Sequence, residues 1–310
     1  MRALSLLPAL LLAAAGATAP PPLDHAPLLR ARAATYLTPA EPVAGIELGG
    51  DARAYPLRFL DAHAVANDSI DHHPVAIAYC RSCGSVMAYR TDTPKGTLTL
   101  AASGRYRDGD QLLVDRQTKT LWKQLTGKPV EGPLAGSGIE LQPVPVVLIS
   151  WTNWFQARAE TRVLSLATGF KREYKPVGPA VDEPQALVFG VVVNGAARAY
   201  PVDRVAKDGV IDDELGGRPI AIVAEPGADP RNRTIRAFER GDRTFTRSGH
   251  SLLGASFIND QDGHPWSVGE EALARPDGKK LPRLPARLTG AAGWSAAYPE
   301  SGVYGEAKTP

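Results

Sequence analysis

Two thiols in one short segment are the residues of this chain whose type and spacing could do chemistry. Cys80 and Cys83 are its only cysteines, and they stand in the run Tyr79-Cys80-Arg81-Ser82-Cys83-Gly84. Two thiols three positions apart can share a metal ion or form a disulfide. No other thiol exists that could pair with either of them. The chemistry of the protein is therefore predicted to run through this turn or close to it.

Three interpretations of the cysteine turn compete. As an inert disulfide it would close a loop of four residues, which the loop-entropy formula values at only roughly 2 kcal/mol. As a redox pair it has the oxidoreductase spacing, but the thioredoxin-like context needs a long helix after the second cysteine. Residues 84–90 have the pattern of a strand instead. A redox role would therefore require another fold.

The third interpretation is a metal or metallocofactor site. A strand that ends in Cys-x-x-Cys-Gly resembles the knuckle of a zinc ribbon, in which backbone N–H groups point at the sulfurs. No second Cys-x-x-Cys is present, so the other ligands would be His, Asp, Glu or Met. His63, on a short predicted helix near the cysteine strand, is the first candidate, and Met87 could add a soft thioether. Zinc or copper is the expected metal.

A weaker polar feature lies further along the chain. Asp115 and Arg116 follow a predicted strand, and Trp122 comes shortly after. The acid and the base can simply close their own turn through bonds to the backbone. Their functional alternative is to orient metal ligands from the second coordination shell, together with Met87 and Trp122.

The beginning of the chain predicts export. Arg2 is followed by the apolar run 4–15 and by small residues, so residues 1–17 are predicted to be a signal peptide cut before Thr18. The run is too short for a comfortable membrane span. A secreted or periplasmic protein is expected, in a compartment where disulfides persist.

Charge excludes some partners. The 310 residues carry 35 basic and 33 acidic side chains, a formal net charge of +2. This balance predicts neither nucleic-acid binding nor stable membrane insertion. A small molecule or another protein remains as the partner, and the pattern does not specify which.

An internal repeat organises the chain. The run 51–57 returns as 196–202, with Tyr55 and Tyr200 145 positions apart, and the run 74–78 returns as 219–223 at the same offset. Asp68 aligns with Asp212 if one small gap is placed between. Three further alignments are predicted: Trp122 with Trp266, Trp154 with Trp294, and Cys80 with Glu225. The second copy therefore cannot hold a metal or a disulfide as the first does.

Strand-like alternation dominates both copies, and many Gly and Pro residues favour short strands. Short helices are expected after Pro56, after Ser150 as N-cap, and around Trp294. The predicted fold is α+β, mainly β: two antiparallel β units with short edge helices. The predicted boundaries are 28–170 for the first copy, 171–185 for a linker and 186–300 for the second copy.

Several motifs in combination resemble domain of unknown function 3179, a family of exported bacterial proteins. The motifs are Tyr55-Pro56, His63, Asn67-Asp68, Pro74, Tyr79-Cys80-x-x-Cys83-Gly84, Asp115-Arg116-x-Thr118, Leu121-Trp122-x-Gln124, Gly127, and Trp154 before Arg162-Val163-Leu164. The chain departs from the usual pattern at Asp71-His72-His73, where the family tends to have glycines, and these residues could add ligands. The resemblance implies export but no established activity.

Three functions therefore stay open. The leading hypothesis is metal or metallocofactor binding through Cys80 and Cys83, completed by His63 or another histidine. The alternatives are a periplasmic thiol–disulfide redox protein and a non-catalytic binding module whose cysteine pair is incidental. The sequence does not decide whether the protein is an enzyme.

Overall fold

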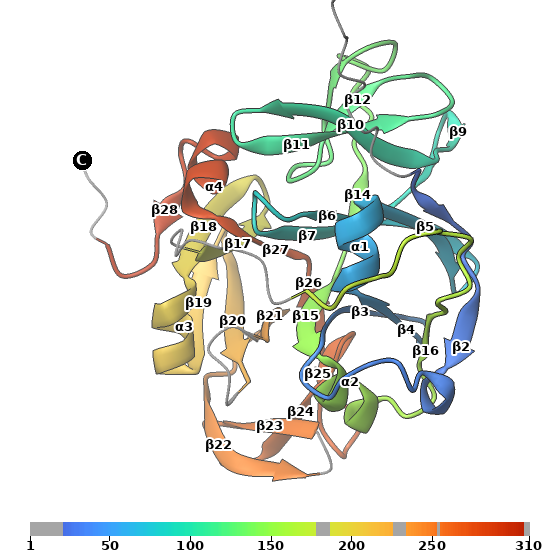
Figure 1. Ribbon diagram of the computed structural model, residues 1–310. Coiled ribbons are helices and arrows are strands. Elements are labelled where there is room, and N and C mark those ends of the chain that lie inside the picture. The colour runs from blue at the N-terminus through green and yellow to red at the C-terminus, as the bar shows by residue number, and fades with distance from the viewer. Residues whose placement is uncertain (1–20, 178–186, 226–233, 253–254, 307–310) are drawn as a thin grey trace, which may run out of the picture.

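Short strands and tight turns make up most of the computed structural model, which describes residues 21–177, 187–225, 234–252 and 255–306 (Figure 1). About half of the chain is strand, and four helices are present in the described residues. The mainly β, α+β prediction is confirmed. The predicted signal peptide lies outside the described residues.

The first half contains one 3-10 turn, two helices and sixteen strands. They are β1 (Leu23–Asp24), β2 (Leu28–Arg30), η1 (Ala31–Ala33), β3 (Pro42–Leu48), β4 (Asp51–Pro56), α1 (Leu57–His63), β5 (Val65–Ile70), β6 (His73–Cys80), β7 (Ser85–Arg90), β8 (Asp92–Thr93), β9 (Gly96–Thr97), β10 (Leu100–Arg107), β11 (Asp110–Asp115), β12 (Leu121–Lys123), β13 (Pro129–Glu131), β14 (Gln142–Val144), β15 (Val147–Ser150), α2 (Trp151–Ala157) and β16 (Arg162–Leu164).

The second half repeats this order with fewer additions. Its elements are β17 (Leu187–Val193), β18 (Ala196–Pro201), α3 (Val202–Asp208), β19 (Val210–Leu215), β20 (Arg218–Ala224), β21 (Ile235–Glu239), β22 (Phe245–Leu252), β23 (Ala255–Asp260), β24 (Pro265–Val268), β25 (Ala272–Ala274), β26 (Lys280–Leu284), β27 (Ala286–Gly290), α4 (Ala291–Ala297) and β28 (Gly302–Val303).

Strand register confirms the duplication and corrects one alignment. Asp68 stands opposite Val75 in the β5–β6 hairpin, and Asp213 stands opposite Ile220 in the β19–β20 hairpin. The hydroxyl of Tyr55 donates to Asp68 at 2.6 Å, as that of Tyr200 donates to Asp213 at 2.7 Å. The partner of Asp68 is therefore Asp213, and the alignment with Asp212 was wrong. The constant offset of 145 leads from Asp68 to Asp213 with no gap, so the gap introduced to reach the neighbouring Asp212 was unnecessary.

The same register explains the departure at Asp71-His72. These two residues turn the β5–β6 hairpin with φ of 46° and 64°, and Gly216 and Gly217 turn its counterpart with φ of 57° and 74°. Two positive φ values match the right-handed twist of a hairpin and favour glycine. The usual glycines are thus explained by backbone geometry.

Buried tryptophans repeat with their hydrogen-bond partners. Each copy buries one indole of a strand, β12 or β24, and one of a helix, α2 or α4, and each indole N–H donates to an oxygen of its own copy. The pairs are Trp122–Asp115 (2.9 Å), Trp266–Asp260 (3.0 Å), Trp154–Thr161 (2.9 Å) and Trp294–Ser301 (2.7 Å). The tryptophan alignments of the repeat are consistent with these pairs, since a buried indole needs a partner for its N–H group.

The predicted helices form where expected. α2 begins after Ser150, whose side chain accepts from the backbone N–H of Asn153 at 3.3 Å. Part of the predicted linker belongs to the first copy's core, because Tyr174 is buried and its ring lies 4.3 Å from that of Phe59. The second copy extends beyond residue 300, since β28 pairs with β18.

The two copies share one nine-stranded sheet. Its path runs β1-β5-β6-β7-β27-β17-β18-β28, and the ninth strand, β14, pairs with β7 beside this path. β7 of the first copy thus pairs with β27 of the second. Val86 stands opposite Leu288 at that junction. A small apolar cavity of about 20 Å³ lies beside both residues. The cysteine turn, which precedes β7, is therefore placed at the boundary between the copies.

Gly45→Ala should destabilise the fold by about 1 to 3 kcal/mol or more, because overpacking a well-filled core has that cost. A Cβ atom at Gly45 would come 2.4 Å from the ring of Trp154. Gly302→Ala is the control, since its Cβ would meet only Arg198 at 3.9 Å. Urea unfolding of both variants measures the difference. Equal stabilities would contradict the close helix packing described here.

Candidate functional site

The cysteine turn joins two central strands of the large sheet. β6 ends at Cys80 and β7 begins at Ser85, and the two cysteines form a disulfide with their Cα atoms 5.2 Å apart. Cys80 is 2% exposed and Cys83 is 8% exposed, whereas Arg81 and Ser82 between them are exposed. The disulfide thus lies just beneath a solvent-facing turn, with Cys83 the more accessible sulfur residue.

Polar groups surround the sulfur of Cys80. The backbone N–H of Cys83 donates to it at 3.1 Å, and the hydroxyl of Ser82 lies 3.5 Å from it. Gly84, with φ of 62°, lets the chain turn into β7. An N–H group aimed at sulfur stabilises a thiolate more than a thiol, which lowers a thiol pKa. In the disulfide, the sulfur of Cys80 thus has the Cys83 N–H and the Ser82 hydroxyl as polar neighbours.

A buried side-chain amide directly after β12, in the four-stranded sheet β10-β11-β12-β13, supports the cysteine turn. The side chain of Gln124 is fully buried and donates to the hydroxyl of Ser85 at 3.1 Å. Its own oxygen accepts from Gln111 at 3.0 Å, and its backbone oxygen accepts from Tyr89 at 2.6 Å. Gln124 belonged to a recognised motif, but Gln111 gave no signal in the sequence.

The second copy contacts the turn directly. The backbone N–H of Gly290 donates to the carbonyl oxygen of Cys83 at 3.1 Å. The hydroxyl of Thr289, which is buried, donates to the same oxygen at 3.4 Å. Both donors belong to the end of β27. Sequence analysis missed them, because nothing in their spacing links them to residue 83.

His63 is buried in a different setting. Its Nδ1 lies 2.6 Å from the carbonyl oxygen of Pro21, and its Nε2 lies 2.8 Å from the hydroxyl of Tyr174. Burial lowers the pKa of His63. The pleat directs Tyr79, which packs in the same core as Tyr174, and Cys80 to opposite faces of β6. Both ring nitrogens of His63 thus have hydrogen-bond partners other than the sulfurs. Its role as a metal ligand remains a prediction.

The other predicted site residues have local partners. Asp115 accepts from the backbone N–H of Thr118 at 2.5 Å and from the indole of Trp122, so its carboxylate closes its own turn. Arg116 forms an ion pair with Asp24 at 2.5 Å. Met87 is 1% exposed in the core beside Trp122. A second-shell role for these residues remains a prediction.

In the second copy, an ion pair stands where the first copy has its cysteines. Glu225 occupies the position of Cys80. Arg236 on β21 occupies the position of Met87 on β7, because Arg236 stands opposite Val223 as Met87 stands opposite Ala78. Arg236 donates to Glu225 at 2.5 Å and to Glu270 at 2.5 Å. A charged hydrogen-bonded network has replaced sulfur and thioether.

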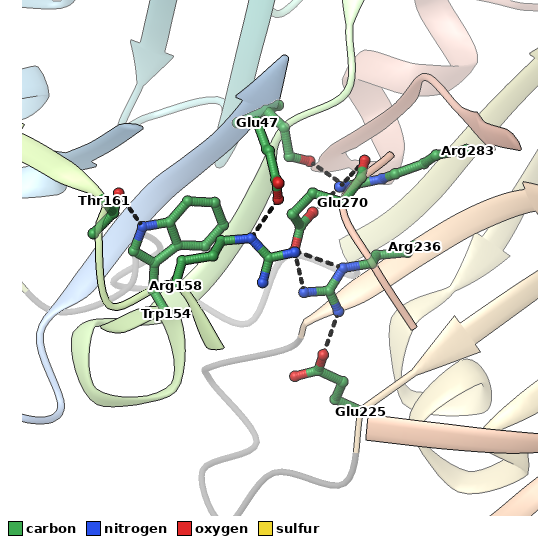
Figure 2. A network of polar contacts seen from close by, with 9 residues as sticks. Glu47, Trp154, Arg158, Thr161, Glu225, Arg236, Glu270 and Arg283 are labelled. Carbon is green, nitrogen blue, oxygen red and sulfur yellow. Dashed lines mark hydrogen bonds and ion pairs between the residues drawn. The ribbon is translucent and has the colours of Figure 1, made fainter. Parts of the chain in front are cut away.

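This network crosses the boundary between the copies. Glu270 is 1% exposed and also pairs with Arg283, while Arg158 of the first copy lies 3.8 Å away and pairs with Glu47 at 2.6 Å (Figure 2). Arg283 further donates to the carbonyl oxygen of Val146 at 3.0 Å. Three guanidinium groups and three carboxylates thus balance their charges. Balance of this kind offsets the cost of burying ions.

A second cluster with metal-like ligands has a structural explanation. Asp260, Asp262 and His264 place oxygen and nitrogen atoms within 4.8 Å of one another. However, Asp260 already accepts from the N–H groups of Asp262 and His264 and from Trp266. Arg243 also lies 2.9 Å from Asp262. Since Asp260 matches Asp115 of the first copy, it closes the equivalent turn.

Asp110 is a buried acid that sequence analysis did not single out. Its carboxylate accepts from the backbone N–H of Leu125 at 2.9 Å, and the carbonyl of Leu125 in turn accepts from Arg287 of the second copy at 2.9 Å. Burial raises the pKa of Asp110 to about 6, and the Leu125 N–H and Lys123 only partly oppose this shift.

The raised pKa of Asp110 generates a pH prediction. Its folded pKa exceeds the unfolded value, so the folded state gains stability below pH 4 and loses it as pH rises through 6. Asp110→Asn should remove this pH-dependent part of the free energy of unfolding. The difference in free energy of unfolding, variant minus wild type, should therefore rise by about 2 to 3 kcal/mol between pH 4 and 7. Chemical denaturation across this range measures it. A stability difference that does not change with pH would refute the argument.

Comparison with known proteins adds a family and no activity. No curated protein and no solved structure matches the chain, and no helix of the described residues is long and apolar enough to span a bilayer. A family model, the protein of unknown function DUF3179, matches residues 19–182 and again residues 177–309. The two matches cover both copies, and the chain therefore belongs to the DUF3179 family.

Proposed function

We propose that this chain is an exported thiol–disulfide redox protein whose working group is the Cys80–Cys83 pair. The observation that carries the proposal is the disulfide itself, closed beneath an exposed turn with an N–H group on the sulfur of Cys80. Its partner would be a dithiol, either on a protein or on a small molecule.

A purely stabilising disulfide explains this turn poorly. A loop of four residues yields only roughly 2 kcal/mol by loop entropy. The β6–β7 hairpin already pairs Cys80 with Ser85, so the cross-link joins segments that the sheet holds together. A reactive role gives a better reason for both sulfurs.

The proposed exchange begins at Cys83. An incoming thiolate attacks the Cys83 sulfur, and the bond to Cys80 breaks. Cys80 leaves as a thiolate, which the Cys83 N–H group stabilises, and then takes up a proton. The second thiol of the donor then displaces Cys83, so the donor becomes a disulfide and the protein a dithiol.

Export supports this chemistry. The first 17 residues have the composition of a signal peptide, and an exported chain enters a compartment in which disulfides form and persist. Cys80 and Cys83 have only each other as thiol partners within the chain. Oxidation after export would therefore give one defined pair.

Reduction of the purified chain in glutathione or dithiothreitol buffers tests the proposal. We expect a reduction potential above about −300 mV, because structural disulfides usually fall below that value. Alkylation followed by mass spectrometry measures the fraction of open pairs. A lower potential would assign the pair to an inert cross-link.

Single cysteine variants provide the internal control for that experiment. With Cys80→Ser, the Cys83 thiolate should attack an added disulfide such as oxidised glutathione and form a lasting mixed disulfide with release of one glutathione thiolate, since no second sulfur displaces it. Cys83→Ser should react more slowly, because Cys80 is only 2% exposed. Equal rates would contradict the assigned order of attack.

Metal binding is a second candidate, restricted to the reduced pair. The bonded sulfurs of the disulfide do not fit a metal ion, since thiolates are the ligands. The Cys83 N–H on the Cys80 sulfur favours the candidate, because metal knuckles use the same bond. Zinc or copper would need further ligands, and His63 would first have to leave Pro21 or Tyr174.

Equilibrium dialysis with zinc separates the two functions. If the metal candidate holds, the reduced chain should bind about one zinc ion, and the oxidised chain and the Cys80→Ser/Cys83→Ser variant none. His63→Gln should then weaken binding at least tenfold if the ring is a ligand. No binding by the reduced chain would exclude the metal candidate. A double variant that keeps the cellular phenotype would favour a binding module with incidental cysteines.

A further inference from the structure

The cysteine-free copy places two hydrogen-bond donors on the redox turn. The N–H of Gly290 and the hydroxyl of Thr289 converge on one oxygen, the carbonyl of Cys83, at 3.1 Å and 3.4 Å. Thr289 is 2% exposed, so solvent does not compete for its hydroxyl. The adjacent pair Val86–Leu288 joins the same two strands.

We infer that Thr289 and the Gly290 amide are positioning groups of the redox turn, so that the second copy completes a site whose thiols all belong to the first. This inference rests on the proposed redox function. It assigns a task to β27 that goes beyond completing the core.

The physical reason lies in the position of Cys83. Its carbonyl is held by the second copy while its own N–H lies 3.1 Å from the sulfur of Cys80. When the disulfide opens, the two sulfurs separate to non-bonded contact through rotation of their side chains together with adjustment of the turn's backbone. A carbonyl held by two donors resists that movement. The contact therefore favours the oxidised form.

Thermodynamic linkage makes the coupling reciprocal. A contact that is stronger in the oxidised form lowers the reduction potential, and reduction must weaken that contact by the same factor. The redox step itself is balanced: an external dithiol supplies two electrons and two protons and becomes a disulfide, while Cys80 and Cys83 become two thiols.

The second contact between the copies, where β21 meets β15, supplies a matched control. Thr234 is also buried, and its hydroxyl donates across the boundary to the carbonyl of Leu148 at 3.3 Å. It lies at the start of β21, the second-copy counterpart of β7. Thr234→Val thus removes an equivalent bond between the copies without touching the cysteine turn.

The experiment compares Thr289→Val, Thr289→Ser and Thr234→Val in the full chain. Reduction potentials are measured in dithiothreitol buffers. We expect Thr289→Val to raise the equilibrium constant for reduction about 3- to 10-fold, which is roughly 15 to 30 mV for a two-electron couple. Thr289→Ser should restore the wild-type potential, and Thr234→Val should leave it unchanged.

Two outcomes would overturn the inference. One is an unchanged potential in Thr289→Val, and the other is an equal shift in Thr234→Val. If Thr289→Val does not fold, amide exchange of the wild-type chain decides, because the Gly290 N–H should exchange faster in the reduced form than in the oxidised form. A wild-type potential below about −300 mV would instead count against the proposed function. The difference between variants would still test the coupling.

Discussion

The pairing of β7 with β27 is the contact on which the arrangement of this molecule depends. It extends the sheet of one copy into that of the other, with Val86 opposite Leu288, and it places the Cys83 carbonyl under two donors from the second copy. The equivalent strands of the opposite pair, β21 and β15, also meet, through Thr234 and Leu148. In each copy, the strand that follows the corresponding hairpin therefore contacts the other copy: β7 follows β5–β6, and β21 follows β19–β20.

The two junctions use equivalent strands of the repeat, although only β7 and β27 form a strand pair, and they differ in chemistry. One contains the disulfide, with the neutral amides of Gln124 and Gln111 behind it. The other contains Glu225 and Arg236 joined to the buried Glu270. Burying ions is costly unless every charge is paired, and a network that loses one member is strongly destabilised. The ionic junction is thus fixed by its own balance, whereas the sulfur junction can change state by gaining two electrons.

The sequence predicted those features whose partners lie within one copy. The tryptophans could be aligned from their spacing in the sequence alone, and each indole has an oxygen partner in its own copy. The ionic network could not be predicted, because Glu47 and Arg158 are 111 residues apart and Arg158 meets Glu270 only across the boundary between the copies. His63 is close to the cysteine strand in sequence, but strand pleating sends adjacent side chains to opposite faces. No signal in the sequence indicated that Pro21 and Tyr174 would engage both ring nitrogens of His63.

Under the proposed redox function, duplication offers a reason why only one copy carries thiols. If both junctions held a disulfide, reduction would loosen both boundaries at once. With the Glu225–Arg236–Glu270 network in the second copy, one boundary keeps its ion pairs whatever the redox state of Cys80 and Cys83. The cysteine turn can then open against a partner strand that the other junction still holds in place. The absence of cysteine from the second copy would thus restrict the proposed redox change to one end of a shared interface.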